Sequence, residues 1–189
     1  MTAIASLVSL SSRLAIPFGL YHRPTKADLV LAARAQASVD FTLLLPSTLP
    51  LGYSLVGTRG VEFARDLVMM TFAGPRRKSF RLTERRASMS LRTELAGAGI
   101  PHEAVRFANQ DFELIGGEFV GEPVDLWHWH TTRRAISWEQ GGVICEIGAV
   151  VAEAPSLRQC LQIAAAVQPL TRFQPSPQLQ SAKGVDVSP

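Results

Sequence analysis

The sequence has little cysteine and lysine, and it contains no long uninterrupted hydrophobic run. The two cysteines, Cys145 and Cys160, form neither a Cys-x-x-Cys pair nor the framework of a disulfide-rich domain. We therefore expect two small buried thiols, with a disulfide left open for an oxidising compartment. The apolar stretch 3–20 is interrupted by Arg13 and Pro17 and has no basic leader, so it fits neither a secretory signal nor a membrane span.

Sequence signatures of catalysis are also missing. There is no Gly-x-Ser-x-Gly elbow and no glycine-rich phosphate loop, and the pair Gly116-Gly117 is typical of a turn. Acidic pairs such as Glu139 and Glu146 carry no mark of an acid–base couple, and surface carboxylates are the default interpretation. The sequence therefore predicts a protein that is not an enzyme, without catalytic residues and without a cofactor.

The composition is that of an ordinary globular protein. Apolar residues make up 47% of the 189 residues and charged residues 19%, which argues against global disorder. The net charge of +3, from 19 basic and 16 acidic residues, is too small to indicate nucleic-acid binding by itself. We expect an N-terminal arm over 1–24, one α+β domain over 25–173 and a disordered tail over 174–189, where Pro, Ser and Gln prevail.

The pattern along the chain predicts an α+β fold: a strongly twisted antiparallel meander with two main helices packed on one face. One helix spans 26–38, started by Thr25 with Asp28 three residues later, and the other spans 155–168. A shorter helix follows Ser90. The expected strands are 53–57, 67–72, 79–84, 113–115, 118–120, 126–131, 135–139 and 143–147. The expected core contains Phe72, Phe80, Leu114, Ile136 and one or more of Trp127, Trp129 and Trp138.

The most recognisable stretch is a proline–glycine signature between the first helix and the first strand. It runs from Phe41-Thr-Leu-Leu-Leu-Pro46 to Leu49-Pro50-Leu51-Gly52-Tyr53, where the prolines enforce an extended path and Gly52 suits a positive φ. The segment 39–53 resembles the opening of bacterial DUF4367-type domains. Ile136–Cys145 is similar to the hairpin of that family, and the helix from Ser156 to Ala164 is similar to its closing helix.

The resemblance covers about residues 26–170, with recognisable motifs at both ends. It implies an extracytoplasmic sensory or regulatory module, often tethered by a membrane helix and sometimes attached to anti-sigma factors. It supplies no catalytic residues. This chain lacks the tether, which leaves the compartment open: the missing signal and span favour the cytoplasm, whereas the resemblance implies an extracytoplasmic location.

The segment Trp127-His128-Trp129-His130 is the most suggestive for metal binding. Alternation on a strand places the two tryptophans on one face and His128 and His130 on the other, where two imidazoles can share a metal ion. No convincing third ligand follows from the sequence, although Cys145, His102 and Glu146 are candidates. The alternative is a half-buried strand with the histidines at the surface.

A basic stretch over 76–92 suggests a site for an anion or a partner. On a strand, Arg77, Arg81 and Arg85 share one face, and a row of guanidinium groups suits phosphate or an acidic protein. Aromatic side chains for base stacking are missing apart from Phe80, which alternation sends to the opposite face. A solvated strand face, an anionic protein partner and nucleic acid remain as alternatives, with nucleic acid the least favoured.

The leading functional hypothesis is a protein-interaction or regulatory module, or a small accessory subunit of an assembly. Its partner would contact the N-terminal arm or the arginine-rich hairpin. The alternatives are a metal-binding protein or metalloenzyme that uses His128 and His130, and a binder of anions or nucleic acid that uses the arginine-rich hairpin.

Overall fold

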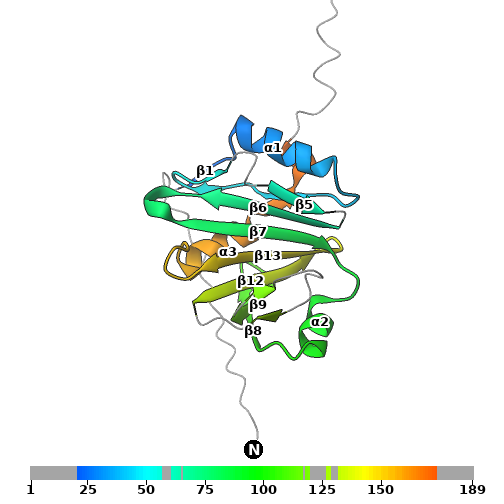
Figure 1. Ribbon diagram of the computed structural model, residues 1–189. Helices are drawn as coiled ribbons and strands as arrows, with labels where there is room; N and C mark the ends of the chain where they lie inside the picture. The colour runs from blue at the N-terminus through cyan, green and yellow to red at the C-terminus, as the bar shows by residue number, and fades with distance from the viewer. Residues whose placement is uncertain are drawn as a thin grey trace, which may run out of the picture.

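The computed structural model describes residues 21–56, 61–64, 66–116, 118–119, 127–128 and 132–173. They form the predicted α+β fold, which is built on one large antiparallel sheet with the strand order β4-β6-β7-β13-β12-β9-β8 (Figure 1). A further strand, β5, pairs with β6 beside β4. The strands of this sheet are β4 (Ser54–Leu55), β5 (Val61–Ala64), β6 (Leu67–Ala73), β7 (Ser79–Arg86), β8 (His102–Phe107), β9 (Gln110–Gly116), β12 (Arg133–Gln140) and β13 (Val143–Val150).

Two helices, α1 (Lys26–Gln36) and α3 (Leu157–Ala165), contribute to one shared core with the sheet, as predicted. Each begins at a capping box, Thr25 with Asp28 in α1 and Ser156 with Gln159 in α3, so the local start signals fix both N-termini. Both helices end earlier than expected. No helix among the described residues is long and apolar enough to cross a membrane.

The main core lies between these two helices and the sheet. Alternation along β6 and β7 directs Val68, Met70 and Phe72 and, from the next strand, Phe80 and Leu82 to this side, and all five are buried. The rings of Phe72 and Phe80 stack with centroids 4.8 Å apart.

Most of the predicted core residues occupy the core. Ile136 and Trp138 are buried, and Leu114 is half-buried against the core. The indole of Trp138 meets Phe112 edge-on at a centroid distance of 5.8 Å. The side chains of Trp127 and Trp129 lie outside the described part of the chain.

The proline–glycine signature runs extended, as predicted, and forms two short strands. β2 (Leu44–Pro46) pairs with β14 (Val167–Pro169), and β3 (Leu49–Pro50) pairs with β1 (Tyr21–His22). Gly52 turns the chain at φ +83°, a conformation that other residues rarely adopt. Tyr21 and His22 of β1, which the sequence analysis assigned to the arm 1–24, thus pair with the proline–glycine signature.

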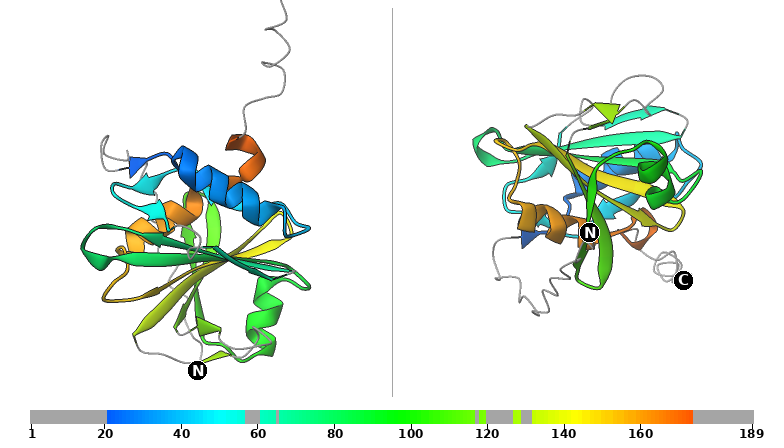
Figure 2. Two further views of the ribbon diagram at one scale, coloured as in Figure 1. Left: turned by 45° about the horizontal axis from the view of Figure 1, so that its top comes forward. Right: turned by 90° about the horizontal axis from the view of Figure 1, so that it is seen from below.

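Two strands of the large sheet, β5 and β8, were not predicted. β8 is an additional strand that pairs with β9 through a tight turn at Ala108 and Asn109, and both of these residues have positive φ. The shorter helix predicted after Ser90 is confirmed as α2 (Leu91–Gly97), with Ser90 as its N-cap residue. It packs on the face opposite α1 and α3, where Leu91, Leu95 and Ile100 form a second, smaller core. The right-hand view of Figure 2 shows α2 and α3 on opposite sides of the sheet.

The predicted strands at 118–120 and 126–131 appear as a short antiparallel pair, β10 (Glu118–Phe119) and β11 (Trp127–His128). The predicted tail over 174–189 lies outside the described residues, as does the arm up to residue 20.

Candidate functional site

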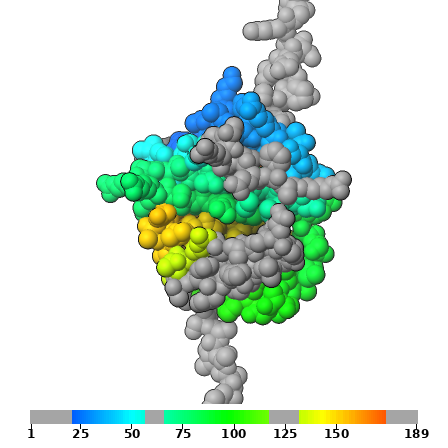
Figure 3. Space-filling view, viewed as in Figure 1, coloured from blue at the N-terminus to red at the C-terminus, as the bar shows by residue number. Residues whose placement is uncertain are grey.

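The face of the sheet that carries α2 is only partly covered among the described residues, and it is hollowed beside that helix. We call this hollow the open-face groove; its volume is about 170 Å³. Figure 3 views this face, with β6 and β7 as the green band across the molecule. The groove is lined by Met69, Thr71, Ser79, Phe80, Arg81, Thr83, Arg85, Leu91, Arg133, Arg134, Ser137, Ile144, Glu146, Gly148, Ala149 and Val150.

Arg81 lies on β7 and lines the groove. Its neighbours across the sheet are Thr71 on β6 and Gly148 on β13. Because Gly148 has no side chain, nothing projects from β13 into the groove directly beside Arg81. The guanidinium makes only a long contact of 3.9 Å to the Sδ of Met69, and it pairs with no carboxylate in the described part of the chain.

Arg85 shares the groove face of β7 with Arg81, as the alternation predicts, but its charge is neutralised. It forms an ion pair with Glu94 of α2, and both side chains are mostly buried. Arg77 does not join them, because β7 begins only at Ser79. Arg77 lies in the short helical turn Pro75–Arg77 with φ +61°, so the expected row of three guanidinium groups is reduced to two.

Hydroxyl groups and one carboxylate complete the polar lining of the groove. The Oγ of Ser137 donates to Oε2 of Glu146 at 3.3 Å, and Thr83 stands opposite Glu146 on the neighbouring strand. Glu146 faces the groove whereas Cys145 faces the core, since consecutive strand residues point to opposite faces. The two therefore do not meet in one site.

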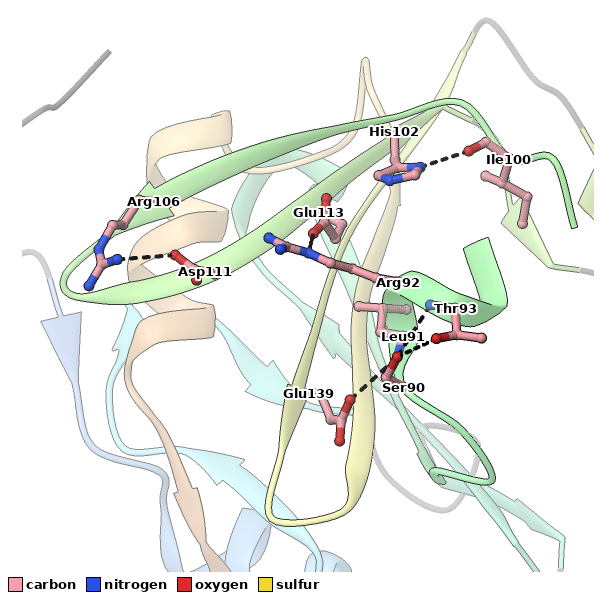
Figure 4. A network of polar contacts seen from close by, with 10 residues as sticks. All are labelled: Ser90, Leu91, Arg92, Thr93, Ile100, His102, Arg106, Asp111, Glu113 and Glu139. Atoms are coloured by element: carbon pink, nitrogen blue, oxygen red, sulfur yellow. Dashed lines mark hydrogen bonds and ion pairs between the residues drawn. The ribbon is translucent and has the colours of Figure 1, made fainter. Parts of the chain in front are cut away.

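Helix α2 borders the groove through Leu91. Polar contacts join the start of this helix to the sheet (Figure 4). The Nε of Arg92 donates to Oε1 of Glu113 at 2.7 Å, and the backbone N–H of Leu91 donates to Oε2 of Glu139 at 3.3 Å. The hydrogen bond and the charge of Glu113 raise the pKa of Arg92. The other carboxylate oxygen of Glu113 is buried without a hydrogen-bond partner. Contacts to Glu113 and Glu139 thus hold the start of α2 against β9 and β12.

The predicted histidine pair lies largely outside the described residues. His128 is in β11, where its backbone pairs opposite Glu118, but its side chain and all of His130 fall outside that part. The candidate third ligand His102 uses Nδ1 in a 2.8 Å contact with the carbonyl of Ile100. No group of three metal-ligating side chains occurs among the residues that the structure describes, so a metal site at His128 and His130 stays a prediction.

One polar core residue was missed by the sequence interpretation. Glu84 lies on the helix-covered face of β7 and is completely buried. Its Oε2 accepts from the backbone N–H of Leu44 at 2.9 Å, while Oε1 has no hydrogen-bond partner. Burial raises the pKa of Glu84 to about 8. The sequence did contain a signal for this burial, because alternation places Glu84 on the same strand face as the apolar Phe80 and Leu82.

Both cysteines are free and buried, as expected, and they occupy the same side of the sheet as Glu84. Burial raises the pKa of Cys145 well above its ordinary value, and the nearby Glu84 raises it further. Neither thiol contributes to the lining of the open-face groove.

The resemblance to DUF4367-type domains rests on short motifs at both ends of the domain, and it stays a prediction. The structure shows those motifs as the strands β2 and β3, the hairpin of β12 and β13 and the helix α3. Comparisons with protein-family models, curated proteins and solved structures find no match to this chain.

Proposed function

We propose that this protein is a non-enzymatic binding module that takes a short acidic segment of a partner protein in the open-face groove. The observation that carries the proposal is the guanidinium of Arg81, which lies in a hollow of the sheet without a carboxylate partner among the described residues. An arginine fork pairs bidentately with a carboxylate, so an aspartate or glutamate of the partner completes its contacts.

The charges of the groove support an anionic partner. The arginines on this face are Arg81, Arg85 and Arg133, and the carboxylate is Glu146, whereas alternation along β12 sends the side chain of Arg134 to the opposite face. Glu94 neutralises Arg85 from outside the lining, and Arg81 remains without a carboxylate partner among the described residues. Like charges across an interface are repelled and opposite charges attract, which favours an acidic segment over a basic one.

The size and chemistry of the groove favour a peptide segment over other anions. Its volume of about 170 Å³ is smaller than the roughly 300–1,000 Å³ of ligand pockets, and it is enough for one or two side chains. The half-buried hydroxyls of Thr71 and Thr83 are suited to hydrogen bonds with a backbone, whereas Ser137 is buried and donates to Glu146. Phe80 directs its ring to the core, so the described lining offers no aromatic ring for stacking bases.

The proposal is tested with the full-length protein and a fluorescein-labelled peptide of alternating glutamate and glycine, whose binding is followed by anisotropy. Arg81→Glu is expected to raise the Kd by about tenfold or more, because it replaces attraction by repulsion at the centre of the groove. Arg34→Glu is the matched control, since it makes the same charge change on exposed α1, away from the groove.

A glutamine–glycine peptide is expected to bind far more weakly than the glutamate peptide. Equal weakening by Arg81→Glu and Arg34→Glu would contradict the proposal, because it would show a response to net charge and not to the groove. Binding of the glutamine peptide with the same Kd would contradict it as well.

A further inference from the structure

A second hollow lies on the helix-covered side of the sheet, where the chain leaves β13 and enters α3. We call it the α3 pocket; its volume is about 290 Å³. It is separate from the open-face groove, because its walls come mainly from the opposite side of β12 and β13 and from the loop 151–156. It is lined by Lys78, Arg134, Ile136, Ile147, Ala149, Val151, Ala152, Ala154, Pro155, Ser156, Leu157 and Cys160.

The walls of the α3 pocket are apolar. Ile136 and Ile147 are buried and belong to the main core, so the pocket opens directly onto core side chains. At the rim, Val151 is 44% exposed and Leu157 is 45% exposed. These two are among the six large apolar side chains that are exposed in the described part of the chain, and an apolar ligand would remove both from water.

The only charged side chains in the lining are two cations, Lys78 and Arg134. Neither forms an ion pair with a carboxylate among the described residues. Alternation along β12 sends Arg134 to the same face as Ile136, toward the pocket. The ammonium of Lys78 lies close enough to the Cys160 thiol to lower its pKa, against the burial that raises this pKa to about 12.

The start of α3 adds to the positive potential at this pocket. Ser156 is the N-cap residue and Leu157 the first helical residue, and both belong to the lining. The side chain of Ser156 accepts from the backbone N–H of Gln159, so the cap itself is satisfied. The positive end of the helix dipole, Lys78 and Arg134 thus surround an apolar cavity with charge of one sign.

We propose that the α3 pocket binds a small amphipathic carboxylate, whose apolar chain lies against Ile147 and Leu157 and whose carboxylate lies between Lys78 and Arg134. The two parts of such a ligand match the two parts of the lining. An uncharged apolar molecule leaves the cations without a counter-charge, and a cationic amphiphile is repelled by them. The volume lies just below the lower end of the range for small-molecule pockets, about 300 Å³, which restricts the ligand to a single short chain.

The proposal is tested by isothermal titration of the full-length protein with decanoate, kept below its micelle concentration, and with decyltrimethylammonium of the same chain length. Saturable binding of decanoate is expected, without comparable binding of the cation. Lys78→Met keeps an apolar side chain of similar length and removes the charge, and it is expected to raise the Kd for decanoate by about tenfold.

Two further variants locate the binding. Ala152→Trp places a large ring at the exposed rim of the pocket and is expected to abolish binding, while circular dichroism confirms that the variant is folded. Lys26→Met, on exposed α1, is the control for the loss of one lysine charge and is expected to leave the Kd unchanged.

Three results would overturn the proposal. One is the absence of decanoate binding, which would leave the pocket to another occupant, such as residues 1–20 of this chain or an apolar side chain of a partner protein. The second is equal binding of decanoate and decyltrimethylammonium. The third is decanoate binding that neither Lys78→Met nor Ala152→Trp changes.

Discussion

The carboxyl group of Glu84 lies opposite the thiol of Cys145 on the adjacent strands β7 and β13, and both side chains are completely buried. Apart from the N–H of Leu44, the carboxyl has no hydrogen-bond partner. A charged carboxylate at this position would be poorly solvated. The Glu84 carboxyl therefore keeps its proton up to a pH near 8.

The first prediction is that the protein loses stability as the pH rises from about 4.5 to about 8. The folded state keeps Glu84 protonated up to its pKa of about 8, whereas the unfolded chain releases this proton near the ordinary glutamate pKa of 4.5. The stabilising contribution of Glu84 is complete below the pKa that this group has in the unfolded chain. It is lost as the pH rises to and through the pKa that the group has in the folded protein. Between these values the unfolding free energy falls by up to ~1.4 kcal/mol per pH unit from this group.

Urea denaturation of the wild type and Glu84→Gln over this pH range measures the effect. Glutamine keeps an acceptor for the N–H of Leu44 and does not ionise, so the stability of Glu84→Gln is expected to change much less with pH. Glu103→Gln, at an exposed position on β8, is the control and is expected to follow the wild type. Parallel pH curves for the wild type and Glu84→Gln would rule out the buried carboxyl as the cause.

The second prediction concerns the reactivity of the thiols. Because burial raises the pKa of Cys160 to about 12 and that of Cys145 well above its ordinary value, little thiolate forms at neutral pH. A disulfide reagent such as dithionitrobenzoate is expected to modify the native protein more than about a hundredfold more slowly than the urea-unfolded chain. Arg106→Cys adds an exposed thiol on β8 as the positive control. Rapid modification of a native cysteine would show that one of these positions opens to solvent.

The third prediction concerns the second core beneath α2. Leu95 is completely buried there and contacts the cluster that contains Ile115 and Ile144. Leu95→Ala is expected to lower the unfolding free energy by about 2–4 kcal/mol, because it leaves a cavity between α2 and the sheet. Met89→Ala, at a position that is 51% exposed just before the helix, is expected to change it by less than about 0.5 kcal/mol. Denaturant titration distinguishes the two, and equal effects would mean that α2 does not pack as the structure shows.

The elements that the sequence predicts well begin or end at local signals. Thr25 and Asp28 mark the start of α1 by a capping box, and Gly141 and Gly142 allow the positive φ of the hairpin between β12 and β13. These signals act over a few residues and need no knowledge of the rest of the chain.

The missed elements lack such signals. The turn between β8 and β9 uses Ala108 and Asn109 at positive φ, where glycine would have marked it, so β8 was not predicted. Arg77 also has positive φ, and the turn thereby removes it from the strand to which simple alternation assigned it.

The candidate sites depend on contacts between distant parts of the chain. Alternation alone places Arg81 and Arg85 on one face. However, the groove also depends on Gly148 of β13, which lies opposite Arg81, and its charge depends on Glu94 of α2, which pairs with Arg85. Such strand register and helix placement cannot be read from a single sequence, and the same holds for the α3 pocket.

The central claim is that an acidic segment binds the open-face groove, and mapping of the bound peptide by NMR tests it most directly. The full-length protein, labelled with ¹⁵N, is titrated with the glutamate–glycine peptide while its amide signals are followed. The account predicts shifts that cluster at the groove, at Thr71, Arg81, Thr83 and Ser137, and that disappear in Arg81→Glu. Shifts that cluster instead on α1 and α3, or no shifts at saturating peptide, would contradict it.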